Sequence, residues 1–501
     1  MTPAPSPAGD DAGEPSWLDG APLLAAWRRF ADAGPTPFTI PGHKRRAASL
    51  SPTLGRLLDA DVPLYGGADT MKLSTGVLAQ AEQLGAALWE VPWCRYSTGG
   101  STHANQVMCL AVGRPGATVL VARNAHRSVL SGLVLAGLRP VWLVPATDPR
   151  FGIPSGLSVT DVEQALDHHP DAAAVLLVEP SYLGTLSDVG GIVAAAHRRD
   201  VPVVVDQAWA AHLGFSPLYP PNALQLGADA MVTSAHKTLP AFSQASIVLA
   251  RLDRLDPDRL DRAFEAEHTT SPSAAVLASI DASRALLADD TGTALLERMA
   301  ALVGQAREQL RGAGVVVPGP EDFAPGRFDP AKLVLVLGPA GRSGLDVEND
   351  LLEAGIPVEM ADRDTLVALV SMLDDESTVT RLVTAVLDSL RRSPGVPRPV
   401  RATSSPLPPQ RMSPREAFFS PHEAVPRADA VGRISAEPVA PYPPGVPVLV
   451  PGEEVTASTI DVLDAALSAG NRIAYAADDS LRLLQVVADH ALTLNQHQSD
   501  I

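Results

Sequence analysis

One short segment, Ser234-Ala235-His236-Lys237, carries the residue types that carbonyl chemistry needs. Lys237 is one of only four lysines, whereas the chain holds 39 lysines and arginines together. An amine attacks a carbonyl best when it is partly desolvated and near polar or cationic groups, because both conditions lower its pKa. Ser234 and His236 can hold an anion such as a phosphate at the same place. A surface lysine in a polar loop explains these residues equally well, so the rest of the chain has to decide.

A second segment has residues that could bind an anion. Ser101 and Thr102 follow two glycines just before a helix predicted over residues 105–112. Free backbone N–H groups and hydroxyls at a helix start form a phosphate cradle. Ser and Thr are also the commonest N-caps, so this segment taken alone is weak evidence.

The elements that must position these residues are those of an α/β protein. Runs of Val, Leu and Ile predict strands at residues 118–122, 140–144, 172–178, 201–205 and 228–233, and apolar spacing predicts helices at residues 17–30, 80–89, 105–112, 159–168 and 192–198. The alternation indicates a mostly parallel sheet covered on both faces. His126, Asp206 and Lys237 each follow a predicted strand. Because parallel strands end at one edge, where α/β proteins place ligands, we expect these side chains to converge.

The second half of the chain has a different organisation. Helices are predicted at residues 273–287, 293–311, 344–354, 376–391 and 457–469, and strands at residues 315–317, 332–337 and 366–371. We therefore expect a disordered leader at residues 1–16, a large α/β domain at 17–270, a small α+β domain at 271–392, a Pro, Arg and Ser-rich linker at 393–413, and a C-terminal α+β domain at 414–501.

Composition excludes several classes of function. The net charge of −18 and the pI near 5.1 argue against nucleic-acid binding, which needs a basic surface. Two cysteines, Cys94 and Cys109, rule out a disulfide framework or a cysteine-rich metal site and are typical of a reducing cytosol. The N-terminus lacks a signal-peptide pattern, and no apolar run reaches the ~18 residues of a membrane span. We expect a cytoplasmic protein without a metal, membrane or nucleic-acid partner.

The polar segments together match one cofactor. An aldehyde cofactor with a phosphate and a basic ring nitrogen needs an amine, phosphate donors, a carboxylate at the ring nitrogen and a flat group on the ring. Lys237 supplies the amine, Asp206 the carboxylate and His126 the flat group. The phosphate donors are Ser101, Thr102, Ser234 and His236. Taken singly, Asp206 is more simply a turn residue and His126 a loop histidine; together they match a pyridoxal 5'-phosphate site in chain order.

The chain resembles the bacterial Orn/Lys/Arg decarboxylase family from about residue 17 onward. The resemblance rests on Pro41-Gly42-His43-Lys44-Arg45, Gly100-Ser101-Thr102, Arg123-Asn124-Ala125-His126-Arg127-Ser128, Asp206 with His212-Leu213-Gly214-Phe215, Ser234-Ala235-His236-Lys237 with Ser243-Gln244, Pro414-Arg415-Glu416-Ala417-Phe418-Phe419, Gly432-Arg433-Ile434-Ser435 and residues 441–453.

That resemblance implies the aspartate aminotransferase type of fold (fold type I) and the site roles given above, with Lys237 binding the cofactor covalently. It implies removal of the α-carboxylate of a basic amino acid to give a polyamine precursor, and a homodimer or dimer-based assembly. The length is similar to that of the short arginine decarboxylases, so arginine is favoured over lysine or ornithine.

Substrate choice is where the chain departs from the family pattern. Many short members have Glu and His where this chain has Gln207 and Trp209, and residues 69–74 also differ. Trp209 is therefore a substrate candidate. Glu437 and Glu453 are acidic candidates for the distal cation of the substrate.

Two other functions stay open. The same fold hosts aminotransferases and other lyases, although a shared C-terminal domain favours a decarboxylase. The second open function is that of a catalytically weak relative, which only binds a basic amino acid or a partner protein. Lys237, Asp206 and His126 argue against it, whereas Gln207 and residues 69–74 keep it open.

Overall fold

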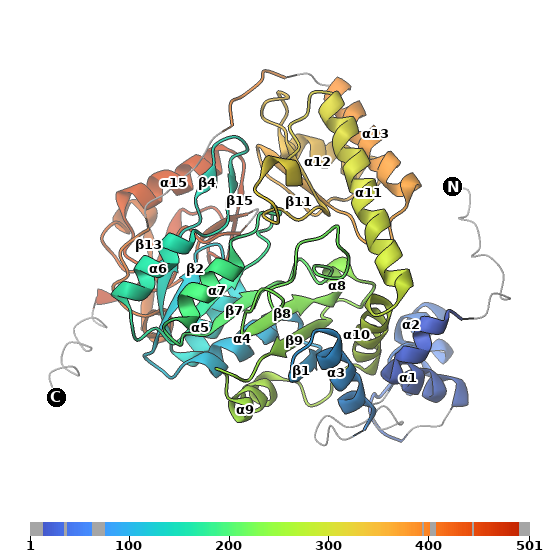
Figure 1. The fold of residues 1–501 in the computed structure, drawn as a ribbon. Coiled ribbons are helices and arrows are strands. Elements are labelled where there is room, and N and C mark those ends of the chain that lie inside the picture. The colour runs from blue at the N-terminus through green and yellow to red at the C-terminus, as the bar shows by residue number, and fades with distance from the viewer. Residues whose placement is uncertain are drawn as a thin grey trace.

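A seven-stranded sheet forms the centre of the chain in the computed structural model (Figure 1). The structure describes residues 14–34, 38–62, 76–392, 395–400, 407–442 and 445–489. The strand order is β1-β9-β8-β7-β6-β2-β3. β9 runs antiparallel to both of its neighbours, and the other strands run parallel to one another. The predicted α/β class and mostly parallel sheet are confirmed.

The strand bounds are β1 Trp93–Ser97, β2 Thr118–Ala122, β3 Arg139–Leu143, β6 Val175–Val178, β7 Val203–Asp206, β8 Ala230–Ser234 and β9 Ser246–Ala250. The five predicted strands all occur, with ends shifted by up to three residues. β1 and β9 were not predicted. Both are short, and their flanking Ser and Gly residues resemble loop sequence, so only their pairing with each other and with β8 makes them strands.

Helices cover both faces of this sheet. They are α3 Val77–Leu88, α4 Gly100–Val112, α5 Arg127–Ala136, α6 Val159–His168, α7 Val189–His197 and α9 Pro257–Glu267. Successive strand residues point to opposite faces. Thus Leu120 packs into the core under α6 and α7, whereas Val121 packs into the core under α4 and α5. Burial on both faces explains why the strands are runs of Val, Leu and Ile rather than alternating patterns.

The N-terminal helix α1 (Pro22–Ala33) packs against α10 (Ala274–Leu287). Asp281 of α10 accepts a hydrogen bond from the backbone N–H of Leu23 at 2.8 Å and pairs with Arg284 at 2.6 Å. The short helix α2 (Pro52–Leu58) follows α1. α10 also contacts β1 and α3, so it joins the N-terminal segment to the edge of the large sheet. The predicted domain boundary at residue 271 stays a prediction.

A smaller α+β unit follows, at the upper right of Figure 1. It consists of α11 Asp290–Gly312, β10 Lys332–Val336, α12 Gly344–Glu353, β11 Met360–Ala361, β12 Thr365–Leu369 and α13 Glu376–Arg392, and its sheet is antiparallel in the order β10-β12-β11. The predicted strand at 315–317 is wrong, because Val316 forms only an isolated bridge to Val336. β11, which was not predicted, is two residues long.

The C-terminal block lies beside the large sheet, at the upper left of Figure 1. It contains α14 Pro414–Phe419, β13 His422–Pro426, β14 Ala440–Tyr442, α15 Ala457–Ser468, β15 Arg472–Ala474 and β16 Leu483–Val487. β13 pairs with β16, and β14 pairs with β15. Of these elements only α15 was predicted. The strands are three to five residues long and β13 is mostly exposed, so they give little periodic signal. In the described ranges, no helix is long and apolar enough to cross a membrane.

Candidate active site

Hydroxyl groups gather where α4 begins beside the end of β8. The Oγ of Ser101 lies 2.7 Å from the Oγ of Ser234 and 3.3 Å from that of Ser246. The backbone N–H of Gly100 donates to the carbonyl of Gln244 at 2.9 Å, which ties the helix start to the loop before β9. His236 binds the carbonyl of Ala245 through Nδ1 at 2.8 Å. The predicted phosphate residues Ser101, Ser234 and His236 are thus brought together, whereas Thr102 is exposed and makes no described side-chain bond with them.

Asp206 and His126 are linked through two side chains that the sequence reasoning missed. Asn105 of α4 donates from Nδ2 to Asp206 Oδ2 at 2.7 Å and to Ser128 Oγ at 2.9 Å. Ser128 Oγ lies 2.8 Å from His126 Nδ1, and Asp206 Oδ1 accepts from the backbone N–H of Ala208 at 3.1 Å. Asn105 is 3 % exposed, so this chain of hydrogen bonds orients both predicted groups inside the protein.

Lys237 stands on α8 (Ala235–Thr238), directly after β8. Its Nζ lies 4.0 Å from the ring centre of Trp209 and 6.0 Å from that of Tyr182, and the two rings are 5.0 Å apart. Burial lowers the pKa of Lys237, whereas the carboxylates of Asp206 and Glu359 oppose that shift. A lysine with a lowered pKa has more of the neutral amine that attacks a carbonyl.

Electrostatic contact joins the three central residues. Burial lowers the pKa of His126, Asp206 raises it, and Lys237 lowers it further. A histidine with a lowered pKa is neutral at neutral pH and suits stacking on an aromatic ring. Lys237, Asp206 and His126 therefore meet at one edge of the sheet, as the carboxyl ends of parallel strands require.

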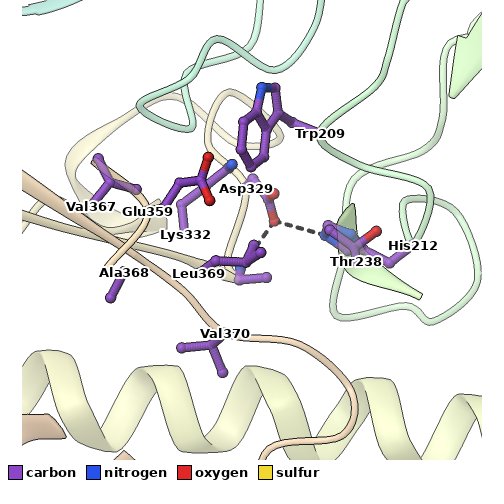
Figure 2. Close-up of a pocket in the computed structure, with 11 residues that line it drawn as sticks. Trp209, His212, Thr238, Asp329, Lys332, Glu359, Val367, Ala368, Leu369 and Val370 are labelled. Carbon is purple, nitrogen blue, oxygen red and sulfur yellow. Dashed lines mark hydrogen bonds and ion pairs between the residues drawn. The ribbon is translucent and has the colours of Figure 1, made fainter. Parts of the chain in front are cut away.

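A second lysine, from the smaller unit, points at the same place (Figure 2). Lys332 Nζ lies 4.2 Å from the ring centre of Trp209. Burial lowers the pKa of Lys332 to about 8, Asp329 opposes this, and Lys237 adds to it. Sequence reasoning missed Lys332, although its rarity in a chain with four lysines was a usable signal.

The remaining predicted residues have other partners. Glu453 forms a bidentate ion pair with Arg123 at 2.6 and 2.9 Å, and the carboxylate of Glu437 accepts the backbone N–H groups of Ala477 and Gln485. Their proposed contact with a substrate stays a prediction, but these bonds point to structural roles.

The amide of Gln207 faces the protein interior. It donates to the carbonyl of Ala210 and accepts from the N–H of Ala223. Gln207 therefore holds the loop after β7. Residues 69–74 lie outside the described residues.

The fold and the site together define a class of protein. Pyridoxal 5'-phosphate requires a particular set of groups, and the site has them. They are a lysine after a strand of this sheet, a buried carboxylate at the end of the neighbouring strand, a histidine, and a hydroxyl cluster at a helix start. Among the described residues, the hydroxyl of Ser101 bonds to those of Ser234 and Ser246, and Ser101 and Ser234 can exchange these bonds for bonds to a phosphate. The residues present fit this cofactor.

The chain belongs to the Orn/Lys/Arg decarboxylase family. The model of the family's major domain matches residues 21–319, and the model of its C-terminal domain matches residues 399–473. The arginine decarboxylase of Halalkalibacterium halodurans is 35% identical over 482 residues, which are 94% of this chain and 98% of that protein. The arginine decarboxylase of Bacillus subtilis is 32% identical over 93% of this chain and 98% of that protein.

Solved structures support the same fold. The lysine decarboxylase of Francisella novicida has a TM-score of 0.80 at 20% identity, covering 93% of this chain and 81% of that one. The serine palmitoyltransferase of Sphingomonas wittichii has a TM-score of 0.54 at 14% identity, over 75% of this chain and 85% of that one. The predicted fold is confirmed. Family membership makes the protein a decarboxylase with pyridoxal 5'-phosphate as its cofactor.

Proposed function

We propose that the protein decarboxylates a basic amino acid, with arginine preferred over lysine and ornithine, and so supplies a polyamine precursor in the cytoplasm. The observation that carries this proposal is geometric: Lys237 directly follows β8, Asp206 ends the neighbouring strand β7, and hydrogen bonds through two further side chains link Asp206 to His126. The preference for arginine is supported by the identity with arginine decarboxylases over nearly the whole chain.

Each residue of the site has a role in this proposal. Pyridoxal 5'-phosphate, when bound, accepts the electron pair of the bond to the departing CO₂. Lys237 would hold the cofactor covalently through Nζ, at the place where the amine of the substrate also binds. Asp206 keeps a proton on the ring nitrogen, because an anionic carboxylate favours the cationic ring.

The other residues bind and orient. His126 would stack on the cofactor ring, and its Nδ1 is held by Ser128. Ser101, Ser234 and His236 hold the phosphate, and the start of α4, a helix of 13 residues, adds its N–H groups. Trp209 covers the amine of Lys237 and excludes water from it.

The test is an assay of the purified protein with arginine, lysine and ornithine. We expect CO₂ release from arginine at the highest kcat/KM and a visible absorbance band from the bond between Lys237 and the cofactor. The Lys237→Ala variant should lose both the band and the activity. A protein that binds the cofactor but releases no CO₂ from any of the three amino acids would contradict the proposal.

We also propose a homodimer or a dimer-based assembly. Large apolar side chains stand exposed on both sides of η2 (Ala47–Ser49), between 57% and 96% exposed: Phe38 and Ile40 before it, Leu50 directly after it and Leu57 on α2. Apolar groups clustered in this way favour an interface. A monomer with full activity, found by light scattering at micromolar concentration, would contradict it.

A further inference from the structure

Two lysines from different parts of the fold meet at one indole ring. Lys237 belongs to the large sheet, whereas Lys332 is the first residue of β10 in the smaller unit. Their Nζ atoms lie 4.0 and 4.2 Å from the ring centre of Trp209. Figure 2 shows Lys332 pointing toward that ring, with Glu359 and Asp329 close to it. The role of Lys237 leaves Lys332 without an assigned function.

The ammonium group of Lys332 is buried without a bound acceptor. Lys332 is 4 % exposed, and among the described residues its Nζ makes a cation–π contact but no hydrogen bond or ion pair. The carboxylate of Asp329 favours the charged form of Lys332. Its Oδ1, however, is already hydrogen-bonded to His212 at 3.1 Å and to the N–H of Ala331 at 3.0 Å. A buried cation without a bonded acceptor is costly, so an anionic ligand would stabilise it.

The recess around Lys332 has further unsatisfied polar atoms. Thr238 Oγ1, His212 Nδ1 and Asp329 Oδ2 are buried and have no hydrogen-bond partner among the described residues. All three residues line the recess together with Trp209 and Lys332. Its cavity volume is about 10 Å³, the space of roughly one water molecule. The recess therefore admits an oxygen atom of a small ligand but excludes a long side chain.

We propose that Lys332 binds the α-carboxylate of the amino acid substrate. This inference rests on the proposed function, since that function brings an amino acid to Lys237. The substrate amine takes the position of Lys237 Nζ, beside Trp209, and its carboxylate is attached one carbon away. A carboxylate oxygen fits the recess, whereas the distal cation of the substrate does not fit and is repelled by Lys332.

The other charged groups around the recess keep this site selective. Glu359 favours the charged forms of both lysines, and Asp329 favours that of Lys332. In the proposed complex, the carboxylate of the substrate accepts a hydrogen bond from Lys332 Nζ. Holding that group fixes the direction of the bond that breaks, which is a positioning effect.

The first measurement needs only the wild-type holoenzyme and three ligands that share one side chain. They are the preferred amino acid, its carboxamide and the amine that remains after CO₂ is lost. The KM of the amino acid is compared with the inhibition constants of the other two, and isothermal titration calorimetry gives a readout besides activity. We expect the carboxamide and the amine to bind about 10- to 100-fold more weakly, since each lacks a charged hydrogen bond. Equal affinity for all three would overturn the proposal.

Variants then assign the effect to Lys332. Lys332→Met keeps the length and loses the charge, and Lys332→Arg keeps the charge. We expect Lys332→Met to raise KM for the amino acid about 10- to 100-fold and to change the inhibition constant of the amine by less than about 3-fold. Lys332→Arg should raise KM less than Lys332→Met does. A parallel change for the amino acid and the amine would show a structural role and refute the proposal.

Failure of this inference differs from failure of the proposed function. If no basic amino acid releases CO₂, the decarboxylase proposal fails, but calorimetry still compares an amino acid with its amine. If CO₂ is released and Lys332→Met changes only kcat, the α-carboxylate contact is wrong while the decarboxylase proposal stands. The visible absorbance band of the holoenzyme checks in each variant that the cofactor is still bound.

Discussion

The ion pair between Arg123 and Glu453 provides the sharpest test of how the C-terminal block is held. Glu453 is fully buried, and Arg123 is 5 % exposed. Their two hydrogen bonds measure 2.6 and 2.9 Å, and Glu453 also accepts from the N–H of Val450 at 2.9 Å. The carbonyls of Pro447 and Val448 bind the same guanidinium. Thus one arginine after β2 holds a loop more than 300 residues further along the chain.

Replacing Glu453 with Gln removes the charge and keeps the size. The guanidinium of Arg123 then stays buried with only neutral acceptors, and breaking a buried pair in this way costs about 3–5 kcal/mol. Adding Arg123→Met to Glu453→Gln removes the unpaired charge, so the double variant should recover most of that loss. Unfolding in urea, followed by circular dichroism, measures the free energy for the wild type, both single variants and the double variant.

A different outcome would mean that Glu453 contacts the substrate. In that case Glu453→Gln would leave unfolding unchanged and raise KM for the basic amino acid, and Arg123→Met would not rescue it. We expect the reverse: a large loss of stability, with any change in KM following the loss of folded protein. Glu437→Gln is a matched control, because its carboxylate binds only backbone N–H groups.

Three further predictions concern the large domain. Burial raises the pKa of Glu179 to about 7. A raised carboxyl pKa gives stability that is present at low pH and lost as pH rises through 7. Between pH 5 and 8 the free energy of unfolding in urea should therefore fall by about 3 kcal/mol more for the wild type than for Glu179→Gln. Asn105→Ala should lower kcat about 10- to 100-fold, because it removes the hydrogen bond to Asp206. Asn105→Asp should lower kcat further, because it puts a second carboxylate beside Asp206. Unchanged kcat in both variants would show that Asn105 does not orient Asp206. Gly184 has a φ of +92°, and a Cβ there would lie 2.7 Å from Cγ of Lys332. Gly184→Ala should therefore destabilise the protein by about 1–3 kcal/mol in thermal unfolding and raise KM. An unchanged melting temperature would contradict this.

Most of the large sheet was predictable because its signals are local. Runs such as residues 118–122 and 228–233 are apolar on both faces, which occurs where a strand is covered from both sides. The edge strand β1 was missed because its partner β9 lies about 150 positions further along the chain. β9, which pairs with β1 and β8, was missed because its flanking residues resemble a loop. The small strands of the C-terminal block were missed for the same reason, since four of them are held by partners rather than by their own sequence.

The sequence by itself singled out Lys237 as the candidate cofactor-binding lysine. Lys237 follows a strand and is flanked by Ser234 and His236, and these residue types do not depend on distant contacts. Asp206 and His126 were also found, because chain order places each of them after a strand. Tertiary structure alone decided what surrounds them. Asn105 binds Asp206 across 101 positions. Lys332 meets Lys237 at Trp209, and Glu453 pairs with Arg123 instead of lying free. Such contacts depend on how the sheet, the smaller unit and the C-terminal block pack, and packing joins residues that no local pattern connects.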